Sequence, residues 1–219
     1  IISDGVFSMG GDITNLPELV RLKKKYGARL LLDDAHSLGI LGDGGRGTAN
    51  HFGLLGDVDV IVGTFSKSLA SLGGFMVADA YVTEYVRHVS RPLIFSASIT
   101  PASCAVALTA LRYLRKHPEI VERLGAVSQY ARDGLMKRGI KIRLSQTPII
   151  PLYTYDAKNT LVTNRYLYDA GVYVNPVLPP ATAASECLLR TSYMATHTYE
   201  ILDEAMDIIQ RVFAARGLI

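Results

Sequence analysis

Two stretches decide the fold of this chain: ARLLLDDAH at residues 28–36 and VDVIVGTFSK at residues 58–67. In each of them a short apolar run ends abruptly in polar side chains. Continuous apolar runs of this length are typical of strands that are buried on both faces of a sheet. A third run of the same character lies at residues 73–78.

The segments around these runs carry the signals of helices. Asn15 is a suitable N-cap for a helix with Pro17 in its first turn, and Gly27 is a suitable stop. Strands that alternate with helices favour a mainly parallel sheet covered by helices on both faces. The first hundred residues are therefore predicted to form an α/β domain.

The second half of the chain changes in character. A helical pattern opens at Thr100 and, restarted by Pro118, continues to Gly139. Further elements are predicted as strands at 149–155, 172–175 and 188–193, a helix at 160–170, and a last helix from the cap Thr198 to about Ala214. The predicted organisation is the C-terminal part of a large domain at 1–100, connecting helices at 101–140, and a small α/β domain at 141–219.

The composition is that of a globular protein, because 49% of the 219 residues are hydrophobic and 20% are charged. The net charge of +3 with mixed signs argues against a nucleic-acid partner, and the lysines at 23–25 are interpreted as a solvated helix face. No apolar stretch reaches the roughly 18 residues of a membrane span. Cys104 and Cys187 match no metal spacing and are interpreted as reduced core residues of an intracellular, cytoplasmic protein.

The chain begins with Ile1-Ile2-Ser3-Asp4 rather than with Met, which is typical of the tail of a strand already under way. No signal peptide is recognisable at this end. We therefore expect further residues upstream, which leaves room for an N-terminal targeting segment.

Polar residues follow two of the predicted strands. Asp33, Asp34 and His36 form one cluster, and a second cluster comprises the side chains at 64 and 66–68. Ligands of open parallel sheets bind beyond the carboxyl ends of the strands, so the two clusters describe one crevice. Taken singly, each has an ordinary alternative: a carboxylate caps a helix, a histidine is structural, and a loop lysine is solvated.

This combination of residues matches what pyridoxal 5′-phosphate (PLP) needs. Its aldehyde must meet a lysine amine, for which Lys67 is the candidate for a Schiff base. A carboxylate must keep its pyridine nitrogen protonated, and hydroxyl and backbone N–H donors must hold its phosphate; Thr64 and Ser66 can supply them.

The stretch GDGGRG at 42–47 fits the G-x-G-x-x-G pattern of dinucleotide-binding loops. It does not directly follow a strand and does not clearly open a helix, so the dinucleotide interpretation fails its context. A flexible or close-packed loop is the better interpretation, with a subunit contact as one location for it.

Four motifs resemble the α-oxoamine synthases, which are fold-type I PLP enzymes. They are VFSM at 6–9 with Asp12, LDDAHSLG at 32–39, GTFSKS at 63–68, and LRT at 189–191 followed by ATHT at 195–198. The resemblance implies that the enzyme condenses an amino acid with an acyl-CoA and releases carbon dioxide. It covers essentially the whole chain, although family members are about twice as long, so the chain looks like their C-terminal half.

The resemblance also implies roles for single residues. Lys67 carries the cofactor and accepts the substrate proton, Asp33 pairs with the pyridine nitrogen, and His36 contacts the phenolic oxygen. Thr64 and Ser66 bind the phosphate. Ser8 forms part of the cofactor pocket, and Arg190 binds the carboxylate of the amino acid. Ser96 contacts the cofactor phosphate of the neighbouring subunit, because the family's sites are shared across a homodimer interface. From sequence alone, Arg190 would be a strand-edge salt bridge.

Within the family, the stretches RPLIFSAS at 91–98, YVN at 173–175 and PPAT at 179–182 favour a branch that uses serine and a long-chain acyl-CoA at the first step of sphingolipid synthesis. Glycine C-acetyltransferase and 8-amino-7-oxononanoate synthase activities are alternatives, as is an inactive fragment or a non-catalytic subunit. Gly10 and Ala183 depart from the family's usual acidic residue and proline. A peripheral contact with a membrane is a further alternative.

Overall fold

The computed structural model describes residues 1–219, which divide into two compact units. Unit 1 comprises Ile1–Val6 and Ile13–Val121, and unit 2 comprises Phe7–Asp12 and Glu122–Ile219. The three segments predicted from the sequence, with separate connecting helices at 101–140, stay a prediction. No helix in either unit combines the length and the apolar character that crossing a membrane requires.

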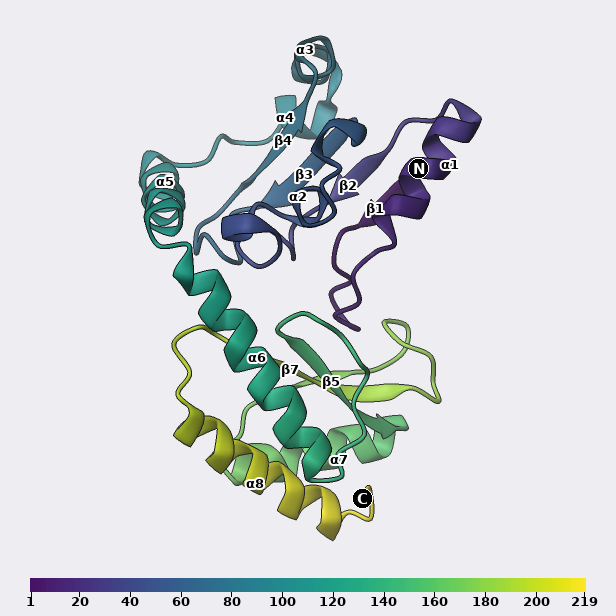
Figure 1. Cartoon of the computed structure of the whole chain (residues 1–219), viewed down its shortest axis with the longest axis vertical. Helices are drawn as coiled ribbons and strands as arrows, with labels where there is room; N and C mark the ends of the chain where they lie inside the picture. Colours follow the sequence, from purple (N-terminus) through teal and green to yellow (C-terminus); the bar gives the residue numbers. More distant parts are fainter. The chain divides into compact units, whose positions relative to one another are not determined.

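Unit 1 contains a four-stranded sheet in the order β1 (Ile2–Asp4), β2 (Leu31–Asp33), β3 (Val60–Thr64) and β4 (Gly74–Ala78) (Figure 1). The first three strands are parallel, whereas β4 runs antiparallel to β3. The loop at 65–73 is too short for the crossover of about a dozen residues that a parallel pairing needs. The predicted mainly parallel sheet is therefore mixed at its β4 edge.

The helices of unit 1 are α1 (Leu16–Tyr26), α2 (Thr48–His51), α3 (Ala80–Val89), α4 (Arg91–Ile94) and α5 (Pro101–Lys116), with short 3₁₀ turns at Asp43–Gly45 and Leu55–Asp57. The predicted ends of α1 are confirmed. Asn15 accepts the Glu18 N–H, and Gly27 adopts a left-handed φ of 60°. The buried side chains of Leu16 and Val20 pack in one cluster with β2, which fixes α1 on the sheet.

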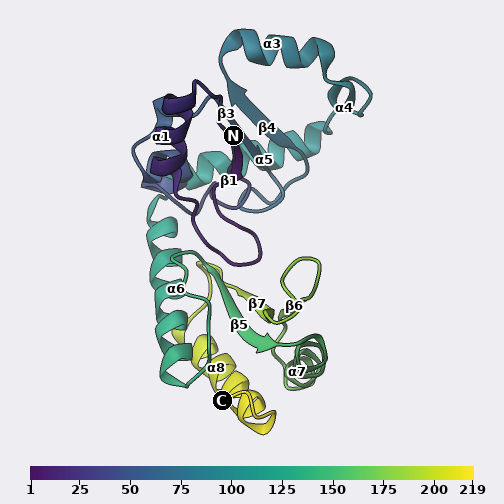
Figure 2. The ribbon, with the colours of Figure 1, turned by 90° about the vertical axis from the view of Figure 1, so that its right-hand side faces the viewer.

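Unit 2 contains most of α6 (Glu119–Lys137), then β5 (Ile149–Tyr155), α7 (Ala157–Asp169), β6 (Asn175–Val177), β7 (Cys187–Ser192) and α8 (Tyr199–Ala215). Its strands form an antiparallel sheet in the order β5-β7-β6, drawn in green to yellow in Figure 2. The strand predicted at 172–175 begins only at Asn175. The Val172 N–H donates to the Leu167 carbonyl at 2.8 Å, a capping bond that closes the end of α7, so residues 172–174 are not free to pair in the sheet.

Three helices and two strands of unit 2 share one apolar core. Buried residues at its centre include Leu135 of α6, Leu152 of β5, Leu167 of α7, Leu189 of β7 and Phe213 of α8. Burial of such side chains contributes on the order of 2 kcal/mol each. The core therefore fixes β7, which carries the sequence-predicted site residue Arg190.

The prediction that both cysteines lie in a core is wrong for one of them. Cys187 is buried and free, whereas Cys104 is free but exposed on α5. The reason lies in α5 itself, because Ala107 is the only residue that this helix buries.

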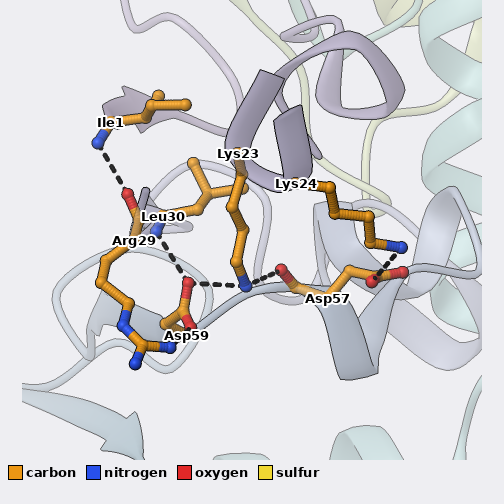
Figure 3. Close-up of polar contacts among 7 residues, drawn as sticks. All are labelled: Ile1, Lys23, Lys24, Arg29, Leu30, Asp57 and Asp59. Carbon is orange, nitrogen blue, oxygen red and sulfur yellow. Dashed lines mark hydrogen bonds and ion pairs between the residues drawn. The ribbon is translucent and has the colours of Figure 1, made fainter. Parts of the chain in front are cut away.

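Asp59 lies at the centre of a polar network in unit 1 (Figure 3). Lys23 contacts this carboxylate at 2.7 Å, the Leu30 N–H donates to it at 2.8 Å, and Arg29 donates at 3.1 Å. Burial opposes its ionisation, but these donors prevail and lower the pKa of Asp59 to about 2. The interpretation of residues 23–25 as a solvated face is thus wrong for Lys23, which is only 16% exposed.

We predict that Asp59→Asn lowers the free energy of unfolding by about 1 kcal/mol at neutral pH, a figure discounted for solvent screening. Because the folded-state pKa of about 2 lies below the ordinary 3.8, the wild-type chain loses this contribution as the pH falls from about 4 towards 2. Urea unfolding across this pH range measures it. The exposed Glu204→Gln, which removes a carboxylate that is in no ion pair, is the control, and equal pH profiles for wild type and Asp59→Asn would contradict the prediction.

The glycine-rich loop at 42–47 is close-packed. A Cβ atom on Gly45 would lie 2.7 Å from the Gly39 Cα, and one on Gly47 would lie 2.2 Å from an Asp34 oxygen. Gly47 precedes the four-residue helix α2, so the loop does open a helix, but one with a single turn. Close packing thus accounts for these glycines without a nucleotide.

Two alanine substitutions separate backbone strain from crowding in this loop. Gly44 and Gly45 both have a positive φ, but a Cβ on Gly44 would only touch Pro118 at 3.8 Å. We expect Gly44→Ala to cost about 1 kcal/mol of stability and Gly45→Ala about 3 kcal/mol or more. Thermal or urea unfolding measures both, and equal losses would show that crowding against Gly39 is unimportant.

Candidate functional site

The parallel register of unit 1 brings the two predicted polar clusters to neighbouring strand ends. Asp33 ends β2, where it lies opposite Asp4 of β1 and Val62 of β3. The next residue, Asp34, donates its N–H to the Val62 carbonyl at 2.8 Å. Thr64, at the end of β3, therefore lies just beyond the same edge of the sheet, as the sequence predicted.

Lys67 lies on a tightly closed turn between β3 and β4. The Phe65 N–H donates to the Gly73 carbonyl at 3.0 Å, and the Ser71 N–H donates to the Phe65 carbonyl at 2.9 Å. Leu69 is buried beneath the turn, while Lys67 itself is exposed. Ala70 adopts a φ of 49°, which is strained for a residue with a side chain. The turn thus presents the lysine amine from a rigid backbone.

The hydroxyl groups beside Lys67 form a local network. The Thr64 and Ser66 hydroxyls lie 2.7 Å apart, and the Thr64 hydroxyl also accepts the Ser66 N–H at 3.2 Å. A Cβ on Gly39 would lie 2.6 Å from the Ser68 Cβ, so the turn after β2 packs directly on the lysine turn. Hydroxyl and backbone donors are therefore concentrated on the residues that flank Lys67.

Asp4 is a member of this cluster that the sequence did not reveal. Burial raises its pKa, the neighbouring charge of Asp33 raises it further, and the charge of Lys67 lowers it. Asp4 thus lies within electrostatic reach of both Asp33 and Lys67. The signal that could have found Asp4 was its place at the end of a strand, just before Gly5.

The neighbouring Asp34 has a structural role. It is 3% exposed and accepts the Thr48 N–H at 3.0 Å, while the Thr48 hydroxyl donates to Ser37 at 2.7 Å. Burial raises the pKa of Asp34, and the hydrogen bonds from Thr48 oppose this shift. Asp34 thereby holds the start of α2, and His36 is half-buried in the same turn.

Arg190 and Ser8 meet within unit 2. The Arg190 Nε–H donates to the Ser8 carbonyl at 2.6 Å, and Nη1 donates to the Ser192 hydroxyl at 2.7 Å. Burial lowers the pKa of Arg190, and none of the ion pairs of the structure includes it. The salt-bridge interpretation is therefore wrong, and this fixed guanidinium has no carboxylate partner in the chain.

The surroundings of Ser96 and Gly10 are also clear from the structure. Ser96 follows α4 in an exposed loop, and no hydrogen bond joins it to the other candidate residues. Gly10 is buried, and a Cβ there would lie 2.3 Å from an oxygen of Asp12, which pairs with Arg143 at 3.1 Å. An acidic side chain at this position would crowd that ion pair, which accounts for the glycine.

The residues of unit 1 fit the chemistry of PLP. An exposed primary amine, a carboxylate within its electrostatic reach, and a hydroxyl pair come together at one sheet edge. These are the groups that the aldehyde, the pyridine nitrogen and the phosphate of this cofactor require. The site residues thus form two groups, with Ser8 and Arg190 on unit 2 and the others on unit 1.

Comparison with known proteins supports the motif resemblance. The chain is 48% identical to a serine palmitoyltransferase of Bacteroides thetaiotaomicron over 219 residues, which is the whole chain and 56% of that protein. It is 40% identical to an 8-amino-7-oxononanoate synthase of Bacillus subtilis over 211 residues, 96% of the chain and 54% of that protein. The chain therefore spans about half the length of these relatives; that it is their C-terminal half stays a prediction.

The fold class is confirmed by solved structures. A structure of serine palmitoyltransferase with PLP as an internal aldimine superposes with a TM-score of 0.95 at 39% identity, over the whole chain and 55% of that structure. The family model for aminotransferase class I and II matches residues 1–209. The chain belongs to the aminotransferase class I and II family.

Proposed function

We propose that this chain carries the catalytic lysine of a PLP-dependent acyltransferase that condenses serine with a long-chain acyl-CoA and releases carbon dioxide. The observation that carries the proposal is the position of Lys67 on a hydrogen-bonded turn, within electrostatic reach of Asp4, the register partner of Asp33. The relatives named serine palmitoyltransferase support the choice of reaction.

The role that we propose for each residue follows from its chemistry. Lys67 supplies the amine that holds PLP, and the same amine takes the proton from the substrate Cα. Asp33 holds a proton on the pyridine nitrogen, and His36 contacts the phenolic oxygen. Thr64 and Ser66 bind the phosphate. When bound, PLP supplies the electron-accepting ring that such a reaction needs.

Residues of unit 2 and of the α4 loop complete the proposal. Arg190 binds the carboxylate of the amino acid, a part that suits a guanidinium already oriented by Ser8 and Ser192 and without a carboxylate of its own. Ser8 lines the cofactor pocket. Ser96 reaches the phosphate in the partner subunit of a homodimer.

A second candidate is 8-amino-7-oxononanoate synthase activity, favoured by relatives at 40% identity, and glycine C-acetyltransferase activity is a third. Steady-state assays of serine, alanine and glycine against acyl-CoAs of several chain lengths distinguish these branches. Serine with a long-chain acyl-CoA is expected to give the highest kcat/KM.

We predict that borohydride reduction of the chain with added PLP attaches one cofactor to Lys67, which intact mass and peptide mapping detect. Lys67→Ala removes the amine and should abolish this labelling, whereas the exposed Lys116→Ala should retain it. Equal labelling of Lys67→Ala, or an unlabelled wild-type chain, would contradict the proposal. An unlabelled chain would instead support an inactive fragment or a non-catalytic subunit.

For Arg190 we predict a loss confined to the amino acid. In the active enzyme Arg190→Gln should raise the KM for serine at least tenfold, because a charge-assisted contact to the carboxylate is lost, and leave PLP labelling unchanged. Arg165→Gln is the matched control, since that arginine pairs with Asp169 on the surface of α7. A change in the KM for acyl-CoA alone would refute the proposed role of Arg190 in binding the amino-acid carboxylate.

A further inference from the structure

Unit 2 contains a cavity of about 290 Å³ between α7 and the C-terminal end of α8. Its lining consists of Tyr166 from α7 with Arg211, Val212, Ala215 and Arg216 from α8 and the residue after it. This volume is at the lower end of the range of pockets that hold small molecules. None of these residues belongs to the motifs or to the proposed PLP site.

The cavity has two guanidinium groups without carboxylate partners. None of the ion pairs of the structure includes Arg211 or Arg216. Asp207, one turn before Arg211, is taken by Arg138 at 2.7 Å. Two positive charges that line one cavity, neither of them in an ion pair with a carboxylate, favour an anionic ligand there.

Arg216 is held in place by neutral contacts. Its Nη2 donates to the Asn159 amide oxygen at 3.2 Å, and its guanidinium carbon lies 5.8 Å from the centre of the Tyr166 ring. The Nε atom of Arg216 is buried without an acceptor. Buried donors of this kind are costly unless they are satisfied, so the site is suited to an acceptor.

The remaining lining is apolar or aromatic. Val212 and Ala215 supply aliphatic surface, and the Tyr166 ring, 55% exposed, supplies a flat face. A lone inorganic anion would leave this surface unused. A ligand that joins a phosphate to a flat ring would use both kinds of lining, since aromatic faces and arginine planes stack on such rings.

We propose that this α7–α8 cavity binds a phosphate ester carried on a flat ring system, of the size of a mononucleotide. Arg211 and Arg216 bind the phosphate, and Tyr166 with the aliphatic side chains contacts the ring. The site is separate from the proposed PLP residues and does not depend on the proposed function.

Calorimetric titration of the 219-residue chain with AMP tests this proposal, with adenosine and inorganic phosphate as the two part-ligands. AMP should bind more tightly than either part. Arg216→Gln and Arg211→Gln should each weaken AMP binding about tenfold or more, because each removes a charged donor. Tyr166→Leu should weaken AMP binding while leaving the binding of inorganic phosphate unchanged.

The matched control is Arg165→Gln, which removes the same charge from α7 outside the cavity and should bind AMP as the wild-type chain does. Arg211 makes no hydrogen bond in the structure, so its variant tests the site even where Arg216→Gln lowers stability. AMP binding that is undetectable at about 10 mM, or that falls equally in Arg211→Gln and Arg165→Gln, would overturn the proposal.

Discussion

The parallel register of β1, β2 and β3 is the constraint on which the candidate site depends. Side chains at the carboxyl ends of parallel strands meet at one edge, so Asp4, Asp33 and Thr64 come together although 29 and then 31 residues separate them. A slip by one residue would turn every strand side chain to the other face. The buried contacts between α1 and β2 oppose such a slip, which links the packing of this unit to its chemistry.

Local signals predicted much of this arrangement. The caps Asn15, Thr100 and Thr198 start helices because one side-chain oxygen satisfies a free N–H, and that requires only the neighbouring residues. The apolar runs before Asp33 and Thr64 identified the strands for a similar reason. The position of Lys67 after the second run then followed from chain order alone.

Contacts between distant residues could not be predicted in the same way. Lys23 looked solvated because its partner Asp59 is 36 residues away, and only the packing of α1 on the sheet brings the two together. The helical pattern that opens at Thr100 is present as α5, yet its apolar residues Leu108 and Leu111 are 46% and 38% exposed. Amphipathic periodicity reports which face of a helix is apolar, and it does not report what covers that face.

Arg190 shows how context changes the meaning of a residue. Its strand position was compatible with an ordinary salt bridge, and only the structure shows that the hydrogen bonds to Ser8 and Ser192 hold the guanidinium without neutralising it. Arg190 is half-buried, and a charge that is partly desolvated, oriented and still unpaired is costly for folding, so its retention favours a use in binding an anion. The same reasoning applies to Arg216, where an amide and an aromatic ring supply the support. In both places neutral partners fix a positive charge, and the missing counter-charge is what points to a ligand.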